Sequence, residues 1–285
     1  MLFAQLQNEL RKLFGKARTY IGFGAFLVAQ NAMLLAFHFS HWQKQVQRVL
    51  EGNGHFALDY ISALTVALVM IIPQIVLLMP LYVCLVGGDM VAKEAEDGTL
   101  RMVLCRPISR LRLLTIKWLA GVVFSIVLVL ALGAMALLFA RMWFPWKGMF
   151  VSSTFIPLPP SDQIFNVLSA GNGLKLYAFQ HVFLSVNAAT MMTLAFMFSC
   201  FNIKPAAATV LGLSFLLLNL VMENIPFFTD YREFMLLHHF RAWVAVYGDP
   251  IQWSRIIGSL CVLAGFNLTC FIIGATAFQL RDIKS

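Results

Sequence analysis

Charged side chains gather between Gly87 and Lys117, a polar stretch that separates two long apolar runs. Before Gly98 the charges are mainly acidic and belong to Asp89, Lys93, Glu94, Glu96 and Asp97. After Gly98 the charges are all basic and belong to Arg101, Arg106, Arg110, Arg112 and Lys117. Adjacent blocks of opposite charge suit a partner protein with the complementary charges. The stretch therefore predicts a protein-binding surface.

The chain carries no sequence motif for chemistry of its own. It has no G-x-x-x-x-G-K-[ST] loop to hold a nucleotide phosphate, no G-x-S-x-G and no H-E-x-x-H. Its five cysteines form no C-x-x-C pair, and the histidines His38 and His41 have no carboxylates nearby in the sequence. We therefore expect no catalytic residue, cofactor or metal ligand in this chain. A membrane protein that handles metal ions with its outer histidines stays as an alternative.

Composition identifies the class of protein. Hydrophobic residues make up 60% of the 285 residues and charged residues 12%, whereas soluble domains are ~45–50% apolar and ~25% charged. Long unbroken apolar runs favour helices over barrel strands, so we predict an all-α polytopic membrane protein. The net charge of +8 comes from bases between the apolar runs, which indicates orientation in a membrane and no nucleic-acid partner.

Six apolar runs approach or exceed the length of about 20 residues that a spanning helix needs. They are residues 20–39, 60–86, 113–140, 176–200, 205–222 and 256–280. The second run contains Pro73 and Pro80, so we expect a tilt or a kink there. Lys117 is the one acidic or basic residue within these runs, histidine aside. Because ion-coupled transporters place such groups at mid-membrane, the energy for any transport must come from another protein.

The distribution of Lys and Arg between the segments predicts the orientation of the chain. The inner segments hold more Lys and Arg than the outer segments if the N-terminus is cytoplasmic, so both termini and residues 87–112 are predicted to lie inside. Residues 1–19 carry apolar side chains at helical spacing. This pattern favours an amphipathic helix in the inner headgroup layer over a plain flanking segment.

The outer segments are short. We expect residues 41–59 to form a modest loop and residues 141–175 an extended loop with three prolines. Residues 223–255 are rich in aromatic side chains, which prefer the membrane interface, and 231–247 is predicted as a short amphipathic helix there. These segments leave no room for a soluble catalytic domain, so we expect residues 1–285 to form one transmembrane domain.

Residues 87–112, called the coupling segment below, predict a helix, a turn and a second short helix. The second span is expected to continue as a helix to Asp97, and Gly98 ends it because glycine adopts left-handed dihedrals at little cost. Thr99 is expected to cap a helix that extends to Cys105 and leaves Leu100, Val103 and Leu104 available to a partner. Pro107 interrupts that helix, and Ser109 caps the third span. The alternative is an ordinary connector at the membrane surface.

Three neutral polar residues in the spans, Gln30, Asn31 and Gln74, allow two interpretations. Hydrogen bonds between helices explain them, at about 0.6 kcal/mol each on average. A path for a substrate through the membrane also explains them. The sequence leaves both interpretations open and favours the first.

The coupling segment and the first residues of the third span resemble the signature of the type 2 ATP-binding-cassette (ABC) exporter permeases. That pattern is approximately E-x-x-x-G-T-L, then P-[VI]-S-R, then L-L-x-x-K. The matching residues are Glu94, Gly98, Thr99, Leu100, Pro107, Ile108, Ser109, Arg110, Leu113, Leu114 and Lys117. The C-terminal Phe278-x-x-Arg281-Asp282-Ile283 is similar to the F-x-x-R-D-[IL] end of the same family.

The resemblance implies a permease subunit in a bacterial inner membrane. It would pair with a second permease, as a homodimer or a heterodimer, and bind separate ATPase subunits that hold ATP and Mg. A helix over residues 99–105 would dock on the ATPase, with Glu94 and Glu96 near basic residues and Arg101 and Arg106 near acidic ones. Family members also carry a re-entrant region before the last span.

The activity that the resemblance implies is export of an unknown, hydrophobic or amphipathic substrate. Its alternative is a permease-like transducer that drives an extracytoplasmic machine without moving a solute.

Overall fold

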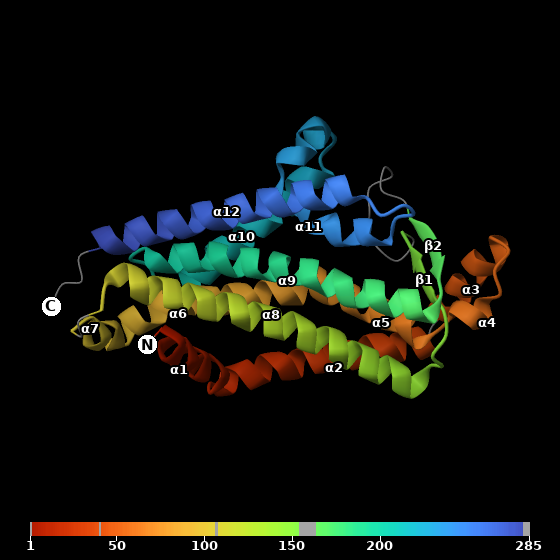
Figure 1. Ribbon diagram of the computed structural model, residues 1–285, viewed down its shortest axis with the longest axis horizontal. Coiled ribbons are helices and arrows are strands. Elements are labelled where there is room, and N and C mark those ends of the chain that lie inside the picture. The colour runs from red at the N-terminus through yellow and green to blue at the C-terminus, as the bar shows by residue number, and fades with distance from the viewer. Residues whose placement is uncertain (1, 40, 106–107, 154–163, 282–285) are drawn as a thin grey trace.

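The computed structural model describes residues 2–39, 41–105, 108–153 and 164–281. In these ranges the protein is a bundle of long helices with a small two-stranded sheet at one end (Figure 1). Six helical spans are long and apolar enough to cross a membrane. The prediction of an all-α membrane protein with six spans is confirmed.

The first span is α2 (Ala17–Phe39), and a shorter helix, α1 (Leu2–Phe14), precedes it. Apolar side chains of α1, among them Leu6, Leu10 and Phe14, pack against the core of the bundle. Helix α1 lies at the end of the bundle where both ends of the described chain are found (Figure 1). Its place in a headgroup layer stays a prediction.

The second span is made of three consecutive helical pieces. They are α5 (Ala63–Pro73), the π-helical turn η1 (Gln74–Leu78) and α6 (Met79–Glu96). The π turn follows Pro73 directly, which fits the tendency of proline and π-bulges to interrupt the regular hydrogen-bond ladder. Helix α6 continues past the predicted end of the span, as expected for the acidic half of the coupling segment.

The other four spans are α8 (Arg110–Trp143), α9 (Ala170–Cys200), α10 (Pro205–Asn224) and α12 (Trp253–Leu280). Helix α9 lies at the centre of the bundle and packs against α6, α8, α10 and α12. Helices α6 and α9 approach closely at Gly87, where an added Cβ would lie 2.4 Å from the carbonyl oxygen of Met192.

The end of the bundle opposite the termini is more ordered than the sequence predicted (Figure 1). Residues 41–59 form α3 (Trp42–Gly52) and most of α4 (Ala57–Tyr60), and the longer loop forms the antiparallel strands β1 (Met149–Ser152) and β2 (Phe165–Leu168). The expectation of an extended loop is wrong at these strands. Strand β1 is held on the start of α5, because Phe150 N donates to Thr65 Oγ1 at 2.9 Å and Ser62 Oγ donates to Gly148 O at 2.6 Å.

The aromatic segment before the last span forms three short helices. They are the 3₁₀ helix η3 (Pro226–Phe234), α11 (Leu236–Phe240) and the 3₁₀ helix η4 (Arg241–Tyr247). The prediction of one amphipathic helix over 231–247 is therefore wrong.

Side chains from the long helices hold this irregular backbone in place. Asn187 Nδ2 donates to Phe240 O at 2.7 Å, and Leu236 N donates to Asn219 Oδ1 at 3.2 Å. Irregular backbone is tolerated at membrane depth only where protein groups satisfy it. These long-range bonds permit three short helices where local periodicity predicted one.

Candidate functional site: the coupling segment and a buried charge cluster

The short helix of the coupling segment is α7 (Thr99–Leu104), which lies between the second and third spans. Gly98 joins it to α6 with a φ of +73°, so the predicted left-handed glycine turn is confirmed. Ser109 Oγ accepts a hydrogen bond from Arg112 N at 3.4 Å, which confirms its predicted role as the cap of α8. These two residues fix where α7 begins and where the next span starts.

Thr99 has a different role from the one predicted. Its hydroxyl donates to the carbonyl oxygen of Glu94 at 3.3 Å, so it satisfies a backbone acceptor at the end of α6. The bond bridges the glycine turn and holds α7 against the helix before it.

Helix α7 directs a different apolar side chain outward from those predicted. Leu100 is 2% exposed and belongs to the core of the bundle, and Val103 is half-buried against that core. The expectation that Leu100 is available to a partner is therefore wrong. Met102 is 66% exposed, and Cys105 just after the helix is also exposed. Among the side chains of α7 that the structure describes, Met102 is the most exposed apolar one and could contact a partner.

Part of the predicted contact surface is not described by the structure. Arg106 and Pro107 lie outside the described residues, and the side chains of Arg101 and Leu104 are not described either. Their contacts with an ATPase stay predictions.

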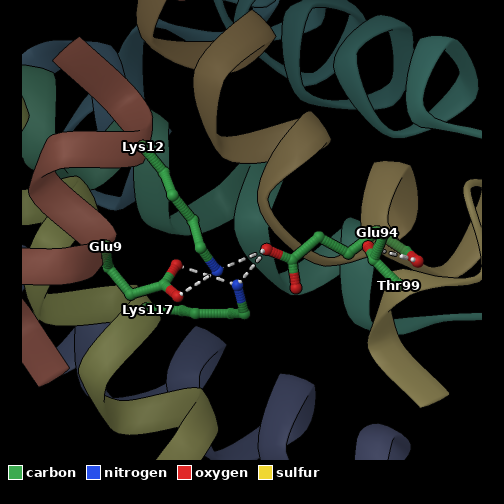
Figure 2. Close-up of polar contacts among 5 residues, drawn as sticks. All are labelled: Glu9, Lys12, Glu94, Thr99 and Lys117. Atoms are coloured by element: carbon green, nitrogen blue, oxygen red, sulfur yellow. Dashed lines mark hydrogen bonds and ion pairs between the residues drawn. The ribbon is translucent and has the colours of Figure 1, made fainter. Parts of the chain in front are cut away.

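Four charged side chains from three helices meet in the space between those helices (Figure 2). Lys117 of α8 forms ion pairs with Glu94 of α6 at 2.7 Å and with Glu9 of α1 at 2.9 Å. Lys12 of α1 contacts Glu9 at 2.7 Å and Glu94 at 3.5 Å. Two acids and two bases thus alternate in a cluster whose formal charges cancel. We call Glu9, Lys12, Glu94 and Lys117 the charge cluster.

The charge cluster is buried enough to constrain the helices that it joins. Lys117 is 2% exposed, and a charge at such a site must be paired because its desolvation costs several kcal/mol. Burial tends to raise the pKa of Glu9, but the charges and hydrogen bonds of Lys117 and Lys12 outweigh it and lower that pKa. Burial tends to lower the pKa of Lys12, but its bonds to Glu9 and Glu94 outweigh it and raise that pKa. Both groups of α1 are therefore stabilised in their charged forms.

The acidic half of the coupling segment divides into an inward and an outward part. Glu94 points into the charge cluster, whereas Glu96 lies at the surface, close to Lys93 at 3.0 Å. Asp97 also lies at the surface and pairs with Lys93 at 3.2 Å. Glu94 was predicted to meet basic residues of an ATPase, but its Oε1 atom pairs with Lys117 and Lys12 of the same chain. Glu96 and Asp97 carry the outward-facing negative charge.

Two arginines join the ends of the spans that lie near α7. Arg110 Nη1 donates to the carbonyl oxygens of Gln279 at 3.1 Å and Arg281 at 3.0 Å, which joins the start of α8 to the end of α12. Arg281 in turn donates to Phe201 O at 3.3 Å and to Asn202 Oδ1 at 2.8 Å, in the turn between α9 and α10. Arg110, predicted to face an ATPase, therefore has partners inside this chain.

The predicted substrate-path residues are only partly brought together. Gln30 Nε2 donates to Leu132 O at 2.9 Å and to Gln74 Oε1 at 3.3 Å, and both glutamines are buried. Asn31 Nδ2 donates to Leu27 O of its own helix at 2.8 Å. These bonds are the helix-to-helix and within-helix contacts of the first interpretation. A role in a substrate path stays a prediction.

Residues that sequence reasoning missed complete the site. Glu9 and Lys12 lie within the predicted amphipathic helix over residues 1–19, for which the sequence predicts no partner inside the chain, and Met102 is not among the predicted contact residues. The signal for Glu9 and Lys12 was present, because a lone lysine in an apolar span requires an acidic partner. Over the part of the chain that the structure describes, no group of three or more His, Cys, Asp or Glu could hold a metal ion.

Comparison with known proteins places these features in a wider group. Residues 6–239 match the family described as ABC-2 family transporter protein. The chain is also similar to a Bacillus subtilis protein described as uncharacterized protein YhcI. The two are 22% identical over 316 aligned positions, which cover 98% of this chain and 99% of the relative.

Proposed function

Because the chain belongs to the ABC-2 family of transporter proteins, and so is a multi-pass membrane permease of an ABC transporter, we propose that α7 is where a separate ATPase drives it. The ATPase supplies the bound ATP and Mg, and the permease exports a hydrophobic or amphipathic substrate. Two permease chains pair in a bacterial inner membrane with their termini and α7 in the cytoplasm.

The charge cluster is the observation that carries this proposal. Glu94 lies at the end of α6 and Lys117 in the first turns of α8, so their 2.7 Å ion pair joins the two spans on either side of α7. Glu9 and Lys12 attach α1, and therefore the start of the first span, to the same point. A movement of α7 is therefore transmitted to three spans together, because these ion pairs join them at one point.

The outer surface of the coupling segment supplies the contact. Met102 gives it an exposed apolar centre, while Glu96 and Asp97 give it negative charge on the side of α6. An apolar anchor within a charged rim is the usual arrangement of a protein interface. We therefore assign Met102 as the anchor and Glu96 and Asp97 as rim residues that face basic groups of the ATPase.

The experiment first identifies the ATPase by co-purification with this chain and then replaces Met102 by Asp in the complex. We expect Met102→Asp to reduce ATPase stimulation by reconstituted permease at least tenfold, since a buried anchor contributes about 1–2 kcal/mol or more. Met142→Asp is the matched control, because Met142 is similarly exposed, 74% against 66% for Met102, but lies at the end of α8 that is far from α7. Unchanged stimulation in Met102→Asp would overturn the assigned contact, and full transport by the chain without any ATPase would overturn the function.

A further inference from the structure

A cavity of about 640 Å³ lies between the second span and α10, beneath the short helices that precede the last span. Its walls are mainly apolar side chains. Those of the second span include Ile75, Val76 and Leu77, and those of α10 include Leu213, Leu217 and Leu220. The cavity opens on the side of the bundle, because Leu77 is 62% exposed and Leu217 is 52% exposed. Its volume is in the range of ligand sites, about 300–1,000 Å³.

One end of the cavity is polar and carries a net positive charge. Glu223 and Arg241 both line it and form a two-pronged ion pair with N–O distances of 2.7 and 2.9 Å, so their charges cancel. Arg232 lines the same end, and its Nε atom is buried without a hydrogen-bond partner among the described residues. A buried guanidinium N–H without an acceptor is costly. This end of the cavity therefore suits an anion.

The polar end lies at the depth where lipid headgroups are found. Helix α10 has 20 residues, and at 1.5 Å per residue it spans about 30 Å, the thickness of the hydrocarbon core of a bilayer. Glu223 and Asn224 at its end therefore lie at the boundary of the hydrocarbon. Segment η3, which carries Arg232, follows directly and projects from the side of the bundle between α10 and α11 (Figure 1).

We propose that this cavity binds an anionic lipid with a phosphate headgroup. The phosphate accepts hydrogen bonds from Arg232, and one acyl chain lies between Val76 and Leu77 of the second span and Leu217 of α10. An apolar tail and a single anionic group match the apolar walls and Arg232, the one charged lining residue for which the described residues show no ion pair. The inference goes beyond the action of an ATPase on α7, because binding requires only this chain in a membrane.

The experiment uses Trp243, which lines the cavity, as the reporter. The full chain is reconstituted in vesicles of phosphatidylcholine that contain either brominated phosphatidylglycerol or brominated phosphatidylcholine. The quenching of Trp243 is obtained by subtracting the tryptophan fluorescence quenched in Trp243→Phe from that quenched in the wild type. We expect the anionic lipid to quench Trp243 at several-fold lower mole fraction than the zwitterionic lipid. Free glycerol phosphate should not relieve the quenching, because it lacks the acyl chain.

Substitutions then test the two ends of the cavity separately. Arg232→Gln should weaken the preference for the anionic lipid about fivefold, while Arg232→Lys keeps most of it. Arg48→Gln, on an exposed residue of α3, should change nothing. Leu217→Phe fills the apolar end without touching Arg232 and should reduce quenching by both lipids. These variants are compared only where they elute as the wild type does on size exclusion.

Three results would overturn the proposal. Equal quenching by the two brominated lipids would show that the charge of Arg232 is not recognised. Absence of Trp243 quenching by either lipid would show that another occupant, such as a second copy of the chain, covers the cavity. Relief by free glycerol phosphate would assign the site to a soluble anion.

Discussion

At the scale of single residues, the ammonium group of Lys117 has two carboxylate neighbours, Glu9 and Glu94, within 3 Å. Replacing a buried ion pair by matched apolar groups is often neutral, but removing one member is strongly destabilising because it leaves a buried charge unpaired. The consequence of changing Lys117 therefore depends on which carboxylates remain.

We expect Lys117→Met to lower the free energy of unfolding by about 3–5 kcal/mol, since Glu9 and Glu94 then share only Lys12. The midpoint of thermal unfolding in detergent measures this. Lys147→Met is the matched control, because Lys147 also contacts an acid, Asp59 at 3.1 Å, but both side chains are exposed. That exposed pair should contribute no more than about 1 kcal/mol.

A second variant separates charge from packing. Adding Glu94→Gln to Lys117→Met removes the unpaired carboxylate and leaves Glu9 paired with Lys12 at 2.7 Å, so it should recover most of the lost stability. Equal stability of Lys117→Met and Lys147→Met would contradict the burial of the charge cluster.

The cluster also indicates what sequence reasoning can find at this scale. Lys117 was recognised as the one charge within the predicted spans, which is a local property of the sequence. Its partner Glu9 is 108 positions away, and sign alone assigned Glu94 to an outside protein. Which of several acids turns inward depends on how α1, α6 and α8 pack, and local spacing does not contain that information.

At the scale of elements, α6 depends on two adjacent glycines for its close contacts. An added Cβ at Gly87 would meet Met192 O of α9 at 2.4 Å, and one at Gly88 would meet Thr209 Oγ1 of α10 at 2.5 Å. Small residues that let helix backbones approach are typical of membrane helix packing. The two glycines thus place α6 between α9 and α10.

We expect Gly87→Ala to destabilise the protein by about 1–3 kcal/mol, because the clash is with backbone that cannot move aside. Gly265→Ala in α12 is the control, since an added Cβ there has no atom within 4 Å. That control should be neutral or more stable, because alanine favours a helix over glycine by about 1 kcal/mol. Thermal unfolding in detergent compares the two, and equal midpoints would disprove the close approach.

Helix α7 shows that the sequence can locate a short helix without predicting the direction in which it faces. Its existence and start followed from Gly98, and the start of the next span followed from Ser109. The direction in which it faces did not follow, because Leu100 is buried by residues of other helices while Met102 is exposed. A helix of six residues presents too few positions for its periodicity to identify a buried face.

At the scale of the whole molecule, hydropathy located the six spans because each apolar run is a property of contiguous residues. It missed β1, β2 and the three short helices before α12. Bonds from distant residues hold at least two of these elements, β1 through Thr65 and α11 through Asn187 and Asn219. Both ends of the described chain and α7 lie at one end of the bundle, and the sheet lies at the other (Figure 1). This arrangement makes the orientation of the chain directly testable.

Cys105 provides that test, because it is exposed beside α7 while Cys84, Cys200 and Cys270 are buried. The other exposed cysteine, Cys261, lies within the span α12. We expect a membrane-impermeant maleimide to label Cys105 rapidly in inverted vesicles and at least tenfold more slowly in right-side-out vesicles, because labelling requires access from the cytoplasm.

The matched control moves the reactive thiol to the other end of the molecule. In Cys105→Ser with Asn53→Cys, labelling should occur from the opposite side, because Asn53 is exposed at the end of α3. Bound ATPase should slow labelling of Cys105, three residues from Met102, but not of the thiol at position 53. Labelling of Cys105 from outside would reverse the predicted orientation. Labelling that is unaffected by the ATPase would contradict its contact with α7.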